Sequence, residues 1–273
     1  MIKLDEVFCI NGFSVGSQAT CLWIKSLDVL FDIGAIDNIA LAVNTLLLSH
    51  AHGDHSGALM SYLSQRRLFP LPYAKIYVPA QTKDLFVQML SICQKLEDLE
   101  YHFEIIGAEP GKRYELKKNF FFMASPVQHR VPALGYTIYE EKKKLKQEYI
   151  SLSPEEIKIL REKGIEIFSL VQNPVFSYLG DCTLDSYLQN EAFRKSKYLV
   201  LECTFLDSKR TIEHSRHWGH IHLEEILQSP DIFSENQKIL LIHFSARYHK
   251  NYVEKVLKTK CPPSLLEKIV LLA

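Results

Sequence analysis

One segment constrains the fold of this chain more than any other: "LLLSHAHGDHSGAL", residues 46–59. An apolar run typical of a buried strand ends there, and ionisable side chains follow it at once. These side chains are His50, His52, Asp54 and His55. Residues two apart in an extended segment point to the same side, so His50 and His52 can reach one metal ion. Asp54 and His55 follow a glycine turn and face another direction, which suits a second ion close by.

Imidazole and carboxylate ligands favour zinc, and manganese or iron would also suit them. Two ions need more ligands than these four. Three further candidates each come directly after an apolar run: His129 in "PVQHRVPALGY", Asp181 in "YLGDCT" and His243 in "LLIHFSARY". Together they complete a two-metal site and leave one carboxylate to bridge the ions.

The rest of the chain alternates between strand-like and helix-like stretches. Short β-rich runs fill residues 7–48, and Leu59, Tyr62 and Leu63 then recur at helical spacing. A second helix is predicted over 82–97, with Thr82 as its cap. Its apolar residues at helical spacing are Leu85, Met89, Ile92 and Leu96. Further strands are expected at 74–79, 119–123, 175–179, 197–205 and 238–246. This order predicts a mixed αβ layered fold.

Residues 140–172 have a different, highly charged composition and are interpreted as a short insertion on the surface. Within them Ser153 as N-cap, Pro154 at the first helical position and Gly164 as terminator predict a short helix. The lysine run at 142–146 could touch phosphates, but acidic residues lie on both sides of it, so a solvated face is expected.

Composition argues against several classes of protein. The 273 residues carry 32 basic and 32 acidic side chains, so no global field attracts nucleic acid or an anionic membrane. The opening "MIKLDEVFCI" is too short and too acidic for a signal peptide, and no apolar run approaches a membrane span. A cytoplasmic protein without a membrane partner is expected. The six cysteines contain no C-x-x-C pair and are expected to be reduced.

The motifs resemble those of the metallo-β-lactamase superfamily and, within it, of the ribonuclease Z group of binuclear zinc phosphodiesterases. The resemblance runs in order through "SHAHGDH", "HRVPALGY", "YLGDCT", "LECTF", "GHIH" and "HFSARY". It implies an α+β fold, a four-layer αββα sandwich with the metals at one edge, and a single hydrolase domain over residues 1–273. It also implies the ligand sets: His50, His52 and His129 on one zinc, Asp54, His55 and His243 on the other, with Asp181 as the bridge.

The same resemblance implies a mechanism. Two adjacent metals would lower the pKa of a bridging water, with Asp54 among the catalytic ligands, and the hydroxide would attack a phosphodiester in line. His220 matches the family's acid histidine and Glu202 the carboxylate that orients it. Ser245 and Arg247 could hold a phosphate oxygen, and this is favoured over an ion pair that fixes the loop, because the two residues follow a metal ligand by two and four positions. Asp32 in "FDIGA" is expected to be structural rather than a ligand.

Several positions depart from the family pattern. Leu201 stands where the family usually has histidine, and "HIH" replaces His-Ser-Thr. His222 either compensates for this change or is a surface residue, and the surface position is preferred. His214 and His217 are expected in a loop near the rim of the site. The insertion at 140–172 lacks the Gly-Pro signature of the arm with which such enzymes grip transfer RNA.

The expected function is therefore a ribonuclease Z-like phosphodiesterase that acts on RNA or a smaller phosphodiester. One alternative is an ester, thioester or lactone hydrolase on the same dizinc site. Another is a non-catalytic RNA-binding or interaction protein that retains the metals. The family is often dimeric, so a homodimer is expected.

Overall fold

The strands of this protein form two sheets, each in the order of the sequence. The computed structural model describes residues 1–117 and 119–272, and in them each sheet has seven strands. The first sheet contains β1 (Ile2–Lys3), β2 (Cys9–Val15), β3 (Ala19–Ile24), β4 (Val29–Phe31), β5 (Thr45–Leu47), β6 (Ala74–Pro79) and β7 (Phe103–Ala108). The second contains β8 (Arg113–Glu115), β9 (Phe120–Pro126), β10 (Leu134–Leu145), β11 (Phe168–Leu179), β12 (Tyr198–Glu202), β13 (Lys238–Ile242) and β14 (Ile269–Leu271).

Helices connect the parallel strands of both sheets. Strands β4 to β7 pair in parallel, as do β11 to β14, and parallel neighbours need long crossover connections. In the first half these crossovers hold α1 (Gly53–Ser56), α2 (Leu59–Arg66) and α3 (Lys83–Glu97). In the second half they hold α5 (Leu184–Gln189), α6 (Glu191–Lys195), α7 (Ile212–His217), α8 (Leu223–Gln228), α9 (Lys250–Lys260) and α10 (Pro263–Leu266). Short 3₁₀ turns lie at Lys25–Leu27, Ala40–Ala42, Ala80–Thr82, Gln147–Tyr149 and Pro230–Phe233.

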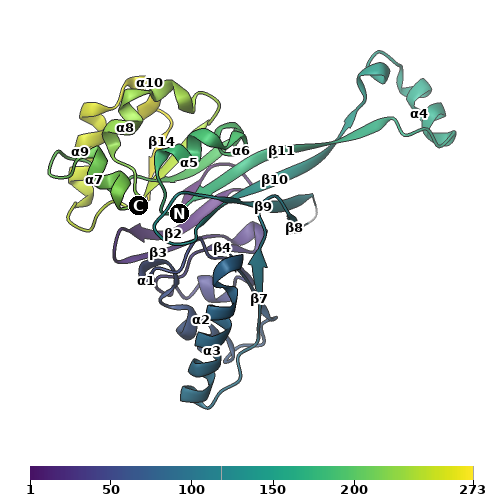
Figure 1. Cartoon of the computed structure of the whole chain (residues 1–273). Helices are drawn as coiled ribbons and strands as arrows, with labels where there is room; N and C mark the ends of the chain where they lie inside the picture. The colour runs from purple at the N-terminus through teal and green to yellow at the C-terminus, as the bar shows by residue number, and fades with distance from the viewer. Residues whose placement is uncertain (118, 273) are drawn as a thin grey trace.

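The two sheets pack face to face with helices on both outer sides (Figure 1). Aromatic side chains from both sheets fill the central layer, where the rings of Phe31 and Tyr178 stack with centroids 4.7 Å apart. A second apolar cluster joins the first sheet to α2 and α3, and a third joins the second sheet to the later helices. This arrangement confirms the predicted α+β fold with four αββα layers.

Helices α2 and α3 agree with the sequence predictions to different extents. Leu59, Tyr62 and Leu63 of α2 are buried, as their spacing predicted. Helix α3 was also predicted, and Thr82 occupies its N-cap position, but the Thr82 side chain makes no capping hydrogen bond, because its hydroxyl donates to the Pro79 carbonyl at 2.9 Å. The helix begins one residue later, after a 3₁₀ turn.

The buried side of α3 is not the side that the spacing marked. Phe86 and Leu90 pack onto the sheet. The four apolar residues at helical spacing are all exposed, by 39% to 77%: Leu85, Met89, Ile92 and Leu96. Helix α3 therefore has apolar residues on both sides, and one of these sides lacks a partner among the described residues.

Strands β10 and β11 continue past the edge of the sheet as a two-stranded arm (Figure 1). Their antiparallel pairing runs out to Leu145 opposite Phe168, beyond the last partners from β9 and β12. The tip of the arm carries α4 (Pro154–Glu162), which Ser153 caps with a complete capping box, so the predicted short helix is confirmed. The segment 140–172 is thus partly strand, since both of its ends belong to this long hairpin.

The sequence also predicted reduced cysteines and no membrane-spanning segment. All six cysteines are free, and four of them are buried: Cys21, Cys182, Cys203 and Cys261. Among residues 1–117 and 119–272 there is no helix whose length and apolar character would allow it to cross a lipid bilayer.

Candidate metal centre

All seven predicted ligands lie together at one edge of the two sheets. The first sheet supplies four of them from the segment after β5, which continues into α1: His50, His52, Asp54 and His55. The second sheet supplies three from the segments after β9, β11 and β13: His129, Asp181 and His243. The carboxyl ends of parallel strands meet at one edge of a sheet, which explains why β11 and β13 of the second sheet deliver their side chains to one place. The segment after β5 of the first sheet reaches the same place from the other sheet.

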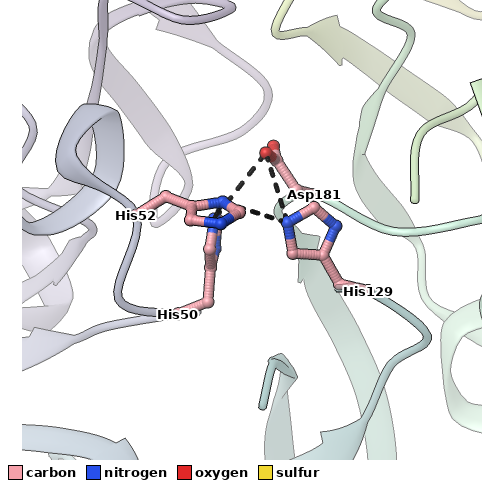
Figure 2. A group of neighbouring side chains, drawn as sticks. All are labelled: His50, His52, His129 and Asp181. Carbon is pink, nitrogen blue, oxygen red and sulfur yellow. Dashed lines mark hydrogen bonds and ion pairs between the residues drawn. The ribbon is translucent and has the colours of Figure 1, made fainter. Parts of the chain in front are cut away.

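The first group of donors consists of His50, His52, His129 and Asp181 (Figure 2). The Nδ1 atom of His52 lies 3.0 Å from Nε2 of His50 and 3.1 Å from Nε2 of His129. The Asp181 Oδ2 atom completes the group at 3.7 Å from His50 Nε2. These donor atoms surround a space suited to one cation.

The second group consists of Asp54, His55, His243 and again Asp181. Nε2 atoms of His55 and His243 each lie 3.2 Å from Asp181 Oδ1, and His243 Nε2 lies 3.3 Å from Asp54 Oδ2. Asp181 therefore stands between the two groups and offers one oxygen to each. The predicted division of the ligands into two sets matches this geometry.

The chemistry of the donors fits divalent cations. Asp181 is buried, yet its Oδ1 atom makes no hydrogen bond to any described residue. A buried carboxylate oxygen that accepts no hydrogen bond is costly, and a metal ion would satisfy it. Burial lowers the pKa values of His50, His52 and His129, which keeps these imidazoles neutral with a lone pair free for a metal. The clusters thus form a metal-binding site.

The second group also attracts positive charge. Burial opposes the charged form of His55, but Asp181 and Asp32 outweigh it and raise its pKa well above the usual value. Burial likewise opposes ionisation of Asp181, but His243 and His55 hold its pKa well below the usual range. A cation in this group, whether a proton or a metal ion, therefore neutralises buried carboxylates.

The histidines are oriented by partners on their second ring nitrogen. His50 Nδ1 lies 3.0 Å from the Ser49 hydroxyl, and His243 Nδ1 lies 2.9 Å from the Thr204 hydroxyl. His129 Nδ1 lies 2.9 Å from the Gly219 carbonyl. Such contacts fix the tautomer and the ring plane of a metal-binding histidine.

Gly219 is required by this close approach. Its φ of 75° lies in the left-handed region, and a Cβ atom there would stand 2.6 Å from His129 Nδ1. Neither Gly219 nor Thr204 was predicted as a site residue. Thr204 stood within the quoted motif "LECTF", so its hydroxyl could have been proposed, whereas Gly219 carried no chemical signal of its own.

Asp32 supports the metal centre through hydrogen bonds, and it is not one of the donors, as the sequence suggested. It is fully buried and accepts hydrogen bonds from the Ser49 backbone N–H at 2.6 Å and the Tyr178 hydroxyl at 2.5 Å. Its Oδ2 atom also lies 2.7 Å from His55 Nδ1. Asp32 thereby ties a histidine of one sheet to a tyrosine of the other, and this position is structural.

His220 and Glu202 adjoin the second group of donors. Glu202 is buried and lies 2.9 Å from His220 Nδ1, while the Thr204 hydroxyl donates to its other oxygen at 2.6 Å. Burial would lower the pKa of His220, but Glu202 and Asp181 raise it to about 9. A histidine protonated at neutral pH and oriented by a carboxylate can give a proton to a leaving oxygen.

Known proteins resemble the chain in sequence. No family model matches it. A curated relative, tRNase Z TRZ1 of Arabidopsis thaliana, is 37% identical over 260 residues, which cover 94% of this chain and 92% of the relative. The chain belongs to the ribonuclease Z family. Like other members of this family, it is a metal-dependent phosphodiesterase, which confirms the predicted class of enzyme.

Solved structures share the fold of this ribonuclease Z family member. The short form of human tRNase Z matches it with a TM-score of 0.62 at 16% identity, over 96% of this chain and 95% of that one. The metallo-β-lactamase fold protein YhfI from Bacillus subtilis matches with a TM-score of 0.59 at 14% identity, over 97% and 95%. At such identities the likeness concerns the fold alone, and it confirms the predicted metallo-β-lactamase fold.

One departure from the ribonuclease Z pattern corrects a prediction. His222 is 2% exposed, not on the surface. Its Nδ1 atom accepts a hydrogen bond from the Glu224 N–H at 3.1 Å and so caps α8, and its Nε2 atom lies 3.1 Å from the Asp207 carbonyl. The apolar neighbours Ile221 and Leu223 are fully buried as well.

The structure also places Leu201, His214 and His217, for which the sequence led to expectations. Leu201 is buried within β12 in the apolar cluster under the later helices, so its side chain takes no part in the centre. His214 and His217 belong to helix α7 rather than to a loop. Three local signals of a helix could have shown this: the Thr211 cap, the acidic Glu213 in the first turn and the basic residues in the last turn.

Arg247 lies outside both groups of donors. Its guanidinium forms an ion pair with Asp207 at 2.8 Å and lies 5.6 Å above the Phe205 ring. The Ser245 backbone N–H donates to the Thr204 carbonyl at 3.0 Å, which fixes the loop after His243. The structure thus contains the alternative ion pair, and phosphate contact by Ser245 and Arg247 stays a prediction.

Proposed function

We propose that this protein uses two zinc ions to cleave precursor transfer RNA. The names of the relatives suggest this substrate, and one structural observation supports it independently. Strand β10 begins five residues after His129, and β11 ends two residues before Asp181. The strands that end at the metal centre are therefore the same strands that form the projecting arm. A large RNA that contacts the arm would be held with one of its phosphodiester bonds at the centre.

The chain's own residues have separate tasks in this proposal. The seven ligands hold zinc, which supplies an activated water and polarises the phosphoryl group when bound. His220 donates a proton to the leaving oxygen, and Glu202 keeps its ring in place through Nδ1. Arg247 contacts a phosphate once its pair with Asp207 opens, since a guanidinium binds phosphate as readily as carboxylate.

The arm has a basic strand and an acidic helix start. Lys142, Lys143 and Lys144 are exposed on β10, whereas Glu155 and Glu156 occupy the first turn of α4. Lys142 pairs with Glu140 at 2.8 Å, whereas Lys143 and Lys144 form no ion pair with any residue that the structure describes, so these two can contact RNA phosphates in spite of the neutral total charge. We therefore favour RNA contact over the purely solvated face expected from composition.

The test compares three substrates on protein of measured metal content. Bis(p-nitrophenyl) phosphate, an unstructured RNA and a precursor transfer RNA are assayed beside Asp54→Ala. We expect about two zinc ions per chain and cleavage of the small diester and the precursor, both lost in the variant. Metal-loaded protein that cleaves none of the three would reject the proposal. The alternatives from the sequence, a carboxylic ester hydrolase and an inactive binding protein, predict that last outcome.

We also propose that the protein forms a homodimer through the exposed apolar side of α3. Leu85, Ile92 and Leu96 are exposed by 65%, 58% and 77%, and a second copy would remove them from water. Light scattering should give a dimer mass for the wild type and a monomer mass for Ile92→Glu. The matched control is Leu170→Glu on the arm, at a residue that is equally exposed, and it should stay dimeric.

A further inference from the structure

A recess of about 350 Å³ lies beside the metal centre, and of its lining residues only Arg247 has a role in the proposed function. Its walls come from the loop after β12, the loop after β13 and the start of α9. The residues that matter for its chemistry are Asp207, Lys209, Arg247, Tyr248, His249 and Tyr252.

The recess is held at a fixed position relative to the reacting groups. The Phe205 ring lies 6.1 Å from the His220 ring on one side and 5.6 Å from the Arg247 guanidinium on another. The two loops are joined by hydrogen bonds, since the Leu206 N–H donates to the Tyr248 hydroxyl at 3.1 Å. A nucleotide close to the cleaved bond could therefore reach the recess without any movement of the backbone.

Positive charge dominates the recess. Arg247 and Lys209 line it, and the single carboxylate among the six residues, Asp207, is paired with Arg247 at 2.8 Å. Helix α9 starts at Lys250 directly after His249, and its first turn contains no acidic residue. The partial positive charge of this helix end adds to the attraction for an anion.

An aromatic ring stands beside this charge. The Tyr252 ring stacks on the Tyr248 ring with centroids 5.4 Å apart and 15° between the planes, and Tyr252 is 40% exposed. The Leu206 N–H donates to the Tyr248 hydroxyl and fixes the Tyr248 ring. Tyr252 stacks on this fixed ring, so the other face of Tyr252 is free to stack on a base. Cationic groups around an exposed aromatic ring are the arrangement that binds single-stranded nucleic acid.

We propose that the recess binds a nucleotide of the RNA near the cleaved bond, with its phosphate on Lys209 and Arg247 and its base on Tyr252. The proposal rests on the proposed function, because it assumes an RNA substrate. It adds a specific contact point for unpaired RNA that the metal centre and the arm do not provide.

Direct binding tests the recess separately from cleavage. A fluorescein-labelled phosphorothioate oligouridylate, which resists hydrolysis, is titrated with zinc-loaded protein at several salt concentrations and followed by anisotropy. Tyr252→Ala should weaken binding about tenfold with an unchanged salt slope, because stacking involves no counterion release. Lys209→Ala should lower the slope of log K against log salt by about 0.7, the value for one phosphate contact on a single strand.

Matched controls lie elsewhere on the surface. Tyr73 is also exposed and stacked, on His102 at 5.0 Å and 15°, and Lys75 is exposed nearby. Tyr73→Ala and Lys75→Ala should bind as the wild type does, and Tyr252→Phe should retain binding because it keeps the ring. Thermal unfolding verifies that each variant is folded.

The outcomes separate the two proposals. Equal affinities of Tyr252→Ala, Lys209→Ala and wild type would overturn the recess, and so would the absence of any binding by the wild type. If binding shows the expected losses while the wild type fails to cleave precursor transfer RNA, the recess stands and the proposed substrate is wrong.

Discussion

Four of the five histidines of the metal centre are held at both ring nitrogens, one facing the other donors and one facing the protein: His50, His55, His129 and His243. The ligands themselves were predictable, because local runs such as "SHAHGDH" place them at strand ends. Their partners were not, since Gly219 is 90 residues from His129 and Thr204 is 39 residues from His243. A motif reveals which side chains can bind a metal, whereas the groups that orient them depend on the folded chain.

At the same scale, the role of His220 can be tested by the choice of leaving group. His220→Gln should lower kcat on precursor transfer RNA by about 10²- to 10⁴-fold, because a sugar alkoxide needs a proton to leave. The same variant should cleave bis(p-nitrophenyl) phosphate nearly as fast as the wild type, since p-nitrophenolate leaves unprotonated. Steady-state rates on both substrates give the comparison. An equal loss on the two substrates would point to a damaged metal centre instead.

His222 should contribute to stability rather than to metal binding. His222→Ala removes the cap of α8 and the contact with the Asp207 carbonyl, so unfolding in urea should show a loss of about 2 kcal/mol. His222→Asn keeps a capping oxygen and should lose about half as much. The exposed His217→Ala is the control and should match the wild type. Wild-type stability of His222→Ala would refute this account.

Among the elements, the arm shows how far local sequence rules reach. The helix α4 was predictable from its cap, its proline and its glycine, all within 12 residues. The hairpin that carries it was not, because β10 beyond Glu140 is a run of charged residues without the alternation of a half-buried strand. Pairing with β11 alone organises that run, and this pairing is a long-range property. In helix α3 a local pattern was present but misleading, because the residues at regular apolar spacing lie on the exposed side of the helix and not on the side that packs on the core.

Shortening the arm separates RNA recognition from chemistry. Leu145 pairs with Phe168, so residues 146–167 can be replaced by Asn-Gly, which closes a two-residue hairpin. The shortened protein should lose about a hundredfold in kcat/KM on precursor transfer RNA, because one of two linked contacts with the substrate is gone. Rates on bis(p-nitrophenyl) phosphate should stay at the wild-type level. Unimpaired cleavage of the precursor would show that the arm does not contact RNA.

For the molecule as a whole, the metal centre joins two halves of the chain that otherwise meet mainly through apolar packing. Four ligands come from the first sheet and three from the second. The division into two sheets was beyond the sequence patterns, because strand runs show that sheets exist but not which strands pair. The resemblance to a known family supplied that step.

Removal of the metals should therefore lower thermal stability. Ions that bind only the folded chain stabilise it by about 4 kcal/mol when present at a thousand times their dissociation constant. For a protein of this size, dialysis against a chelator should lower Tm by roughly 10 °C, and added zinc should restore it. Calorimetry with metal analysis of the same samples measures both quantities. An unchanged Tm in protein shown to be metal-free would mean that packing alone joins the halves.

The order of the strands has a consequence for the synthesis of this nuclease. All strands of the first sheet, β1 to β7, precede all strands of the second, β8 to β14, in the sequence. The whole first sheet therefore emerges from the ribosome before the second sheet begins. That first sheet carries four ligands but no Asp181, and the second group of donors stays incomplete until His243 has emerged. A chain that stops before residue 243 thus lacks one ligand of the second group, so we expect such fragments to have no complete metal centre.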